Sequence, residues 1–296
     1  MIVVTTREEA RAARARLGRL GFVPTMGSLH AGHLSLVGAA RRDNEAVAVS
    51  VFVNPTQFGP SEDLDAYPRD LDGDLAKLEA AGVDLVWTPR TADIYPDGFD
   101  TWVAPGAIAT RLEGVARPTH FRGVTTVLSV LFHVLDPQLV YFGRKDAQQV
   151  AVVKAMVRDL GFPVQVVTCP IVRESDGLAL SSRNQYLGEG DRAAAAILHR
   201  ALFEAERAWL GGQTDAEALR AVMRDLLAGE PRATVDYVSV ADPRTLAELD
   251  AVDPTIGALA SLAVRIGRPR LIDNVVLFPH VPMEMPADPV VLSRHD

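Results

Sequence analysis

Short apolar runs alternate with stretches of helical periodicity from the N-terminus to about residue 169. Residues 46–49, Ala-Val-Ala-Val, are apolar without alternation, as expected of a strand buried on both faces of a sheet. The pattern predicts strands at 21–23, 46–53, 83–88, 139–142 and 164–169, and helices at 7–17, 32–42, 71–81, 123–135 and 147–160. This alternation is typical of an α/β fold with a doubly wound (Rossmann-like) parallel sheet, which binds ligands at the carboxyl ends of its strands.

The pattern changes after residue 169, where two alanine-rich helices are predicted at 191–210 and 215–227, followed by strands at 235–240, 259–265 and 271–277. We interpret this part as a second, smaller α+β domain. Pro170 ends the preceding strand and a polar loop follows it, so the chain is divided into residues 1–172 and a C-terminal lid domain, 173–296. The tail from residue 279 contains Pro282, Pro286 and Pro289 and is expected to be loosely ordered.

The amino-acid composition limits the kinds of partner that the protein is expected to bind. The 296 residues include 30 Lys and Arg against 38 Asp and Glu, a formal net charge of −8, which disfavours sequence-independent binding of nucleic acid or anionic membranes. Cys169 is the only cysteine, so an intrachain disulfide is excluded and the cytoplasm is the expected compartment. The N-terminus lacks the apolar core of a signal peptide, and the apolar run at 123–135 is shorter than the roughly 20 residues of a membrane span.

The most informative segment is 23–33, Val-Pro-Thr-Met-Gly-Ser-Leu-His-Ala-Gly-His, which leads from a strand through a turn into a helix. His30 and His33 are three residues apart and share a helix face. The free N–H groups and partial positive charge of a helix start suit a polyphosphate, and Gly32 leaves room for it. Two alternatives remain: the histidines cap or pack the helix, or they bind zinc, although no third ligand with recognisable spacing follows.

Two more segments place polar residues at strand ends. Asn54 and Gln57 follow a buried strand and offer neutral donors and acceptors, although from these residues alone an ordinary Asn-Pro turn explains them better. The acidic stretch 62–70 after them is interpreted as a solvated loop, or alternatively as a lid. Segment 141–149 repeats the order of strand, glycine and helix, and there Lys145 can bridge phosphates while Asp146 can cap the helix or help to hold magnesium.

Cations and hydroxyls occur in two further loops. Arg117 and His120 precede the helix predicted at 123–135 and could hold an anion. At the predicted domain boundary, Ser181 and Ser182 stand next to Arg183, a grouping that can close over phosphates as mobile lids do. As a bare string, that loop could also be only a linker.

Together these segments resemble the pantothenate synthetases, ligases of the HxGH nucleotidyltransferase superfamily that join pantoate to β-alanine with ATP. The match is close over residues 24–187 and continues weakly at 235–237 and 270–274. The resemblance implies that the pantoate carboxylate attacks ATP to form pantoyl adenylate and pyrophosphate, and that β-alanine then releases AMP. It also implies Mg²⁺, whose ligands it leaves unassigned, and a homodimer.

The resemblance further implies roles for individual residues. The implied catalytic residues are His30, His33 and Lys145. The implied ATP contacts are Met26, His30, His33, Gly143, Lys145, Asp146, Val172, Ser181, Ser182 and Arg183. Pantoate and β-alanine would contact Gln57, Gln149, Asn54, Arg117 and His120.

The sequence departs from the family pattern at flanking positions, where Arg144, Ala147, Val130 and His133 replace the usual residues. These changes put local packing or affinity in question before they threaten the reaction. Two other functions stay open: a nucleotidyltransferase that stops after the first transfer, which would lack Gln57 and Gln149 as a pair, and a nucleotide sensor without catalysis. A tRNA synthetase is disfavoured because the excess of acidic over basic residues and the short second domain leave no evident basic surface for tRNA.

Overall fold

A parallel sheet of six strands forms the centre of the first domain. The computed structural model describes residues 1–59 and 64–278. The strand order is β1-β4-β3-β2-β5-β6, with β1 (Ile2–Val4), β2 (Leu20–Thr25), β3 (Ala46–Val51), β4 (Leu85–Trp87), β5 (Leu139–Gly143) and β6 (Gln165–Cys169). Because the chain builds outward from β2 on one side and from β5 on the other, the carboxyl ends of these two strands form the crevice where such sheets bind ligands.

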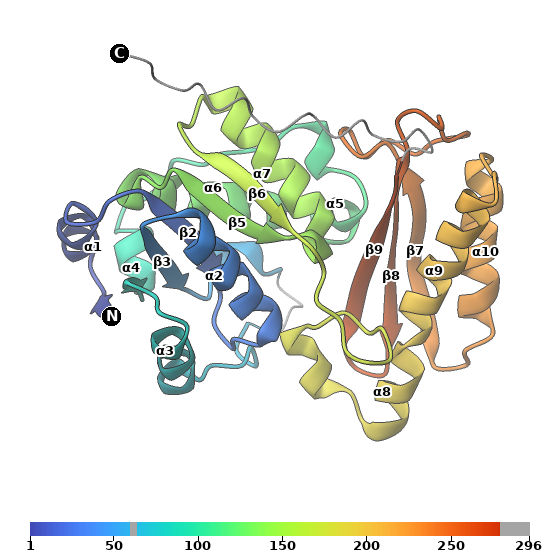
Figure 1. Cartoon of the computed structure of the whole chain (residues 1–296), viewed down its shortest axis with the longest axis horizontal. Helices are drawn as coiled ribbons and strands as arrows, with labels where there is room; N and C mark the ends of the chain where they lie inside the picture. The colour runs from blue at the N-terminus through green and yellow to red at the C-terminus, as the bar shows by residue number, and fades with distance from the viewer. Residues whose placement is uncertain (60–63, 279–296) are drawn as a thin grey trace, which may run out of the picture.

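Helices cover both faces of this sheet, as Figure 1 shows. Helices α1 (Arg7–Arg14), α6 (His120–Leu135) and α7 (Ala147–Leu160) enclose one apolar core, and α2 (Ala31–Asp43) and α3 (Leu71–Ala80) enclose a second core on the opposite face. Both faces of β2 and β3 are therefore buried, which explains why their sequences are apolar without alternation. The predicted doubly wound α/β fold is confirmed.

The second domain contains a three-stranded antiparallel sheet of β7 (Ala233–Ala241), β8 (Ala258–Ile266) and β9 (Arg270–Leu277). Helices α9 (Ile197–Leu210) and α10 (Ala216–Ala228) lie on the face of this sheet turned away from the first domain (Figure 1). Trp209, Leu219 and Met223 from these helices are fully buried in a core shared with β8. The smaller α+β domain is therefore also confirmed.

Several element predictions were wrong in detail. The helix predicted at 191–210 is two helices, α8 (Glu189–Ala195) and α9, and the break at Ala196 falls in an alanine run that carries no stop signal. The strand predicted to reach residue 53 ends at Val51 because Asn54 already caps the 3₁₀ helix η1 (Pro55–Gln57). Strand β1 and the short helices α4 (Thr91–Ile94), η2 (Ala107–Ala109) and α5 (Glu113–Ala116) were not predicted, because segments of this length carry too few residues for a period.

Some predictions about the organisation of the chain are not tested by this fold. The division at 172/173 stays a prediction, and it falls in the connection between β6 and the 3₁₀ helix η4 (Ser182–Tyr186). Residues 60–63, which include the start of the acidic stretch, and the proline-containing tail, 279–296, lie outside the described residues. In the described part of the chain, every helix is too short or too polar to cross a bilayer.

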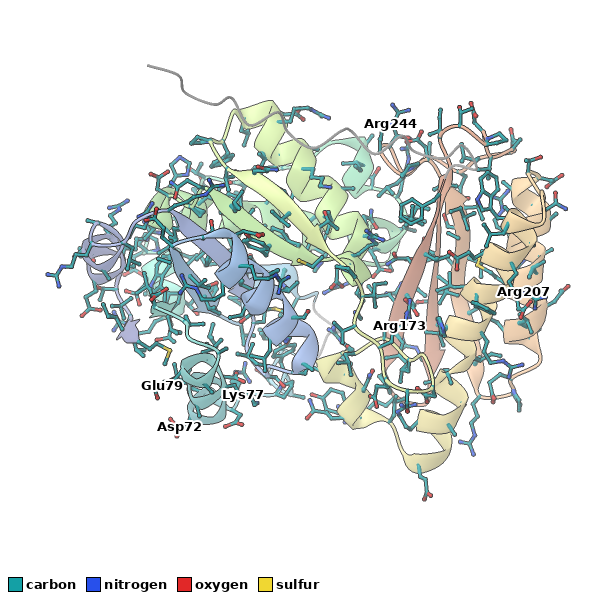
Figure 2. All side chains as sticks on the ribbon, in the orientation of Figure 1. Asp72, Lys77, Glu79, Arg173, Arg207 and Arg244 are labelled. Atoms are coloured by element: carbon teal, nitrogen blue, oxygen red, sulfur yellow. The ribbon has the colours of Figure 1, made fainter. Side chains whose placement is uncertain are left out.

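Strand β9 fastens the second domain to the first. Arg270 donates to both carboxylate oxygens of Glu113 at 2.6 and 3.0 Å. Arg173, labelled in Figure 2, makes the same two-point contact with the buried Asp273, at 2.6 and 3.0 Å, and so attaches the connection that follows β6 to β9. Asn274 donates its amide N–H groups to the backbone carbonyls of Arg144 and Lys145, at 3.0 and 2.9 Å. Arg270 and Asn274 thus attach β9 to the first domain.

We predict that Arg270→Ala lowers the free energy of unfolding by about 3 kcal/mol, because it leaves the carboxylate of Glu113 buried without its cation. Arg158→Ala is the control, since Arg158 pairs with Asp159 on the surface, where an ion pair contributes about 0.5 kcal/mol. Urea denaturation followed by circular dichroism measures both. If both variants lost the same free energy of unfolding, the Glu113–Arg270 pair would contribute no more to stability than a surface ion pair, and the prediction would be wrong.

Candidate active site

The turn between β2 and α2 is held by a buried carboxylate from α3. Gly27 and Ser28 have positive φ angles of 82° and 52°, a conformation that a serine adopts only at some cost. Asp74, which is 1% exposed, accepts the backbone N–H groups of Ser28 and Leu29, each at 2.7 Å. Lys77, whose side chain lies on the side of α3 away from Asp72 and Glu79 in Figure 2, donates to the carbonyl of Leu29 at 3.0 Å. These bonds fix the point at which α2 begins.

His30 and His33 stand at that beginning with their rings 4.1 Å apart. His30 is the N-cap of α2: its Nδ1 accepts the N–H of Gly32 at 3.1 Å, and Nδ1 of His33 accepts the N–H of His30 at 3.4 Å. The capping alternative is therefore correct for His30. It does not compete with ligand binding, because an imidazole that accepts at Nδ1 carries its proton on Nε2 and remains a donor there.

Both imidazoles are neutral at pH 7. Burial, together with the proximity of His30 and of the Lys145 ammonium, lowers the pKa of His33 to about 3. Burial and then the neighbouring Lys145 also lower the pKa of His30. The pair thus offers two N–H donors without formal charge, next to the N-terminal N–H groups of a 13-residue helix.

One wall of the site is formed by η1 and the start of α6. Asn54 and Gln57, 1% and 8% exposed, are joined by a hydrogen bond of 3.1 Å from Nδ2 to Oε1. The backbone carbonyl of Gln57 lies 2.9 Å from Nδ1 of His120 and 3.2 Å from an amino group of Arg117. A Cβ on Gly123 would come within 2.6 Å of the backbone of Thr56, so only glycine allows α6 to pack this closely.

The opposite wall comes from the end of β5 and from the second domain. Lys145 follows Gly143 in the 3₁₀ helix η3 (Arg144–Asp146), and its Nζ lies 3.5 Å from Asp146 Oδ1. Asp146 is the N-cap residue of α7, but its side chain makes no capping hydrogen bond, so the predicted capping role is wrong. Ser182 Oγ donates to the carbonyl of Ser28 at 3.2 Å and so brings the loop of Ser181 and Arg183 against the histidine turn.

These walls enclose one cavity. It is lined by every residue that the sequence singled out: Met26, His30, His33, Asn54, Gln57, Arg117, His120, Gly143, Lys145, Asp146, Gln149, Val172, Ser181, Ser182 and Arg183. Their individual roles stay predictions, but their convergence from segments far apart in the sequence is a property of the fold.

Sequence reasoning missed two groups of residues. One is an apolar compartment of the cavity, lined by Phe52, Val124, Val127, Leu128, Leu131 and Phe142. In the sequence these residues are indistinguishable from ordinary core positions of α6 and the strands. The other is Asp74, whose only sequence signal is a carboxylate on the helix face that also carries the buried Leu78.

The departures from the family pattern lie outside the described lining of this cavity. Val130 packs against the first apolar core, and His133 is exposed, with its ring against Phe162. The guanidinium of Arg144 lies over the ring of Phe278, 5.8 Å from its centroid. Ala147 is half-buried at the start of α7. Their effect is therefore on packing around the site.

Comparison with known proteins agrees with this arrangement. A sequence model of the family described as pantoate-beta-alanine ligase matches residues 2–276. The chain belongs to the pantoate-β-alanine ligase family. Pantothenate synthetase of Chloroflexus aurantiacus is 60% identical over 94% of this chain and 98% of its own length. The enzyme of Herpetosiphon aurantiacus is 58% identical over 94% of this chain and 100% of its own length.

Solved ligases of the family share the fold. The crystal structure of pantothenate synthetase from Thermus thermophilus superposes with a TM-score of 0.90 at 47% identity, covering 94% of this chain and 100% of that one. Pantoate-β-alanine ligase from Francisella tularensis, solved with β-γ ATP and β-alanine, gives 0.76 at 35% identity over 94% and 98% of the two chains. The chain is an enzyme of the ligase class.

The lowered pKa of His33 predicts how this ligase responds to acid. Between pH 6.5 and about 3 the unfolded chain binds a proton at residue 33 that the folded chain does not, so stability falls as the pH falls through this range. We expect His33→Asn, whose Oδ1 can replace Nδ1 as an acceptor, to flatten this dependence by up to about 1.4 kcal/mol per pH unit. Urea denaturation at pH values from about 4.5 to about 7 measures it. Parallel stability curves for the two proteins would show that His33 is not buried in its neutral form.

Proposed function

We propose that the protein condenses pantoate with β-alanine at the expense of ATP, by way of pantoyl adenylate, and releases pyrophosphate and AMP. One observation carries the proposal: a single cavity joins a phosphate-type cluster, His30, His33 and Lys145, to an amide cluster, Gln57 and Gln149. Donors of the first kind suit a triphosphate and those of the second suit the oxygens of a hydroxy acid.

In the first step, a carboxylate oxygen of pantoate bonds to the α-phosphorus of ATP, and the bond from that phosphorus to the bridging oxygen breaks. Negative charge grows on the departing pyrophosphate. The Nε2–H groups of His30 and His33 and the ammonium of Lys145 would donate to it, which lowers the barrier by stabilising charge where it develops. The apolar compartment of α6 suits the two methyl groups of pantoate, and Gln57 and Gln149 suit its hydroxyl and carboxylate groups.

In the second step, the uncharged amine of β-alanine attacks the acyl carbon of the adenylate, and the bond from that carbon to the phosphate oxygen breaks to release AMP. The proton of the amine passes to solvent. Arg117, which lines the same cavity, is the cation we place near the carboxylate of β-alanine, with His120 beside it at 3.3 Å. Holding the two reactants side by side supplies most of the catalysis that such a step requires.

Mg²⁺ would enter with the nucleotide. The described residues contain no group of three or more carboxylate, imidazole or thiolate ligands that could hold a metal on its own. That fits Mg²⁺, which commonly binds through substrate phosphates and one or two carboxylates. Asp146 is the carboxylate in the described lining of the cavity and is the residue we propose to hold it, where the ion would neutralise phosphate charge.

The relatives support the same substrates. The Francisella ligase was solved with β-γ ATP and β-alanine, and the match covers 94% of this chain. We also propose that Ser181, Ser182 and Arg183 close over the phosphates together with Val172, that Met26 and Gly143 contact the nucleotide, and that the protein acts as a homodimer in the cytoplasm. Sedimentation at micromolar concentration tests the dimer.

The reaction is tested by incubating the protein with MgATP and D-pantoate, first without and then with β-alanine, and measuring pyrophosphate exchange and AMP separately. The proposal requires pantoate-dependent exchange without β-alanine, and AMP with an amide product only when β-alanine is present. Exchange without any amide would indicate a nucleotidyltransferase. ATP binding without exchange would indicate a sensor.

We predict that Lys145→Ala slows pantoate-dependent pyrophosphate exchange by about 10²-fold or more, as expected on removal of a charge-stabilising donor. Lys154→Ala is the matched control, because this lysine lies on the helix that follows, α7, but outside the described lining of the cavity. Exchange at the wild-type rate in Lys145→Ala would refute the role given to Lys145.

We predict that Gln57→Ala raises the KM for pantoate at least about tenfold and that for ATP less than about twofold, since the proposal places this amide at the acid and not at the phosphates. Gln165→Ala, at an exposed position at the start of β6, should leave both values unchanged. Steady-state kinetics with each substrate varied in turn decide the matter. An equal rise in both KM values would reject the assignment.

A further inference from the structure

A hydrogen-bond network lies directly behind the cavity wall that carries Gln57. Its outermost member is Tyr95, whose hydroxyl donates to Oδ1 of Asn54 at 2.8 Å. Thr56 adds a second hydroxyl, 3.0 Å from Asn54 Oδ1 and 3.0 Å from the oxygen of Tyr95. Tyr95 itself is not part of the described cavity lining, so any effect it has on a ligand passes through Asn54.

The network fixes which way each amide points. Asn54 presents one end to the backbone carbonyl of Gly123 at 3.1 Å, and a carbonyl only accepts hydrogen bonds. That end of Asn54 is therefore its NH₂ group, and Oδ1 is the end that faces the two hydroxyls. The same NH₂ group donates to Gln57, which leaves Oε1 of Gln57 on the Asn54 side and directs Nε2 of Gln57 into the cavity.

In the described part of the structure, no other hydrogen bond of the Gln57 side chain strongly fixes the direction of its amide group. Its Nε2 lies 2.9 Å from Sδ of Met26, and a thioether is a weak acceptor that a ligand oxygen readily replaces. A glutamine amide that turned over would present Oε1 to the cavity instead, and would meet the lone pairs of a carboxylate with lone pairs of its own. The direction of this one amide therefore decides whether Gln57 attracts or repels an anionic oxygen.

The position of the Tyr95 hydroxyl is itself well supported. The ring packs edge-on against Phe99, with centroids 5.0 Å apart, and is stacked near Trp102 at 6.3 Å. The guanidinium of Arg122 covers Trp102 at 4.6 Å. Burial raises the pKa of Tyr95, so the phenol keeps its proton and remains a donor across the physiological range.

We propose that Tyr95 is a positioning residue for the acid substrate: through Asn54 it holds Gln57 with its amide N–H groups directed at an oxygen of pantoate. The proposal rests on the function proposed above and deepens it, because it names an outer residue that supports the orientation of the amides in the acid subsite. Tyr95 touches neither substrate, and it changes the affinity for the acid without contributing to the phosphate cluster.

The test is Tyr95→Phe, which removes one hydroxyl and keeps the aromatic packing. We expect the KM for pantoate to rise about five- to tenfold, the size of effect that a single hydrogen bond has on an equilibrium, while the KM for ATP changes less than about twofold. Tyr186→Phe is the matched control. It removes a tyrosine hydroxyl that donates to the carbonyl of Ala66 at 2.7 Å, outside the described cavity lining, and should leave the KM for pantoate unchanged.

A double-mutant cycle with Gln57→Ala separates positioning from a structural effect. If Tyr95 acts through Gln57, then Tyr95→Phe changes kcat/KM for pantoate less than about twofold once Gln57 is alanine. The same five- to tenfold loss in both backgrounds would overturn the proposal, and so would an equal rise in the KM for ATP. A wild-type protein without pantoate-dependent turnover would refute the proposed function and this inference with it, whereas normal wild-type turnover with an unchanged Tyr95→Phe variant would overturn this inference alone.

Discussion

The buried carboxylate of Asp74 is the constraint on which the site depends. The chain leaves β2 and enters α2 through two residues with positive φ, a backbone that needs outside support. Asp74 supplies that support with two charge-assisted hydrogen bonds of 2.7 Å to consecutive N–H groups. Since His30 caps the helix that begins there and His33 accepts a backbone N–H of the same turn, the positions of both imidazoles follow from where α3 places one side chain.

The second sheet supports the opposite side of the same site. Asn274 on β9 holds the carbonyls of Arg144 and Lys145, so the backbone that carries the Lys145 ammonium is attached to the second domain as well as to β5. Ser182 reaches across to the carbonyl of Ser28 in the histidine turn. The contacts that join the two domains are therefore also contacts that set the distance between Lys145 and the histidines. Docking of the two domains therefore also brings Lys145 and the two histidines to the same cavity.

The sequence predicts the parts of this molecule whose signal is local. Strands such as β3 are apolar on both faces, and the motifs of His30, Asn54 and Lys145 each follow the end of a strand, so sheet order brings these three together. The roles of Asp74 and Tyr95 could not be predicted from the sequence because their hydrogen-bond partners are distant along the chain. Leu29 is 45 residues from Asp74, and Asn54 is 41 residues from Tyr95. An aspartate on a helix and a tyrosine in a loop carry no mark of such contacts. The break between α8 and α9 at Ala196 was not predicted for a local reason: the residues around it are good helix formers and indicate a continuous helix.

The neutrality of the two histidines suits the reaction proposed for them. A positive charge attracts the phosphates of ATP in the ground state as well as in the transition state, and the part of that attraction common to both states does not raise the rate. An uncharged N–H donor interacts modestly with the bound triphosphate and more strongly as charge accumulates on the departing pyrophosphate. Burial lowers the pKa of His33 to about 3 and holds the pKa of His30 below its usual value, so both imidazoles are mainly uncharged at pH 7. In the proposed reaction Lys145 would both attract ATP to a protein of net charge −8 and stabilise the departing pyrophosphate, and the histidines would add donors whose interaction strengthens in the transition state.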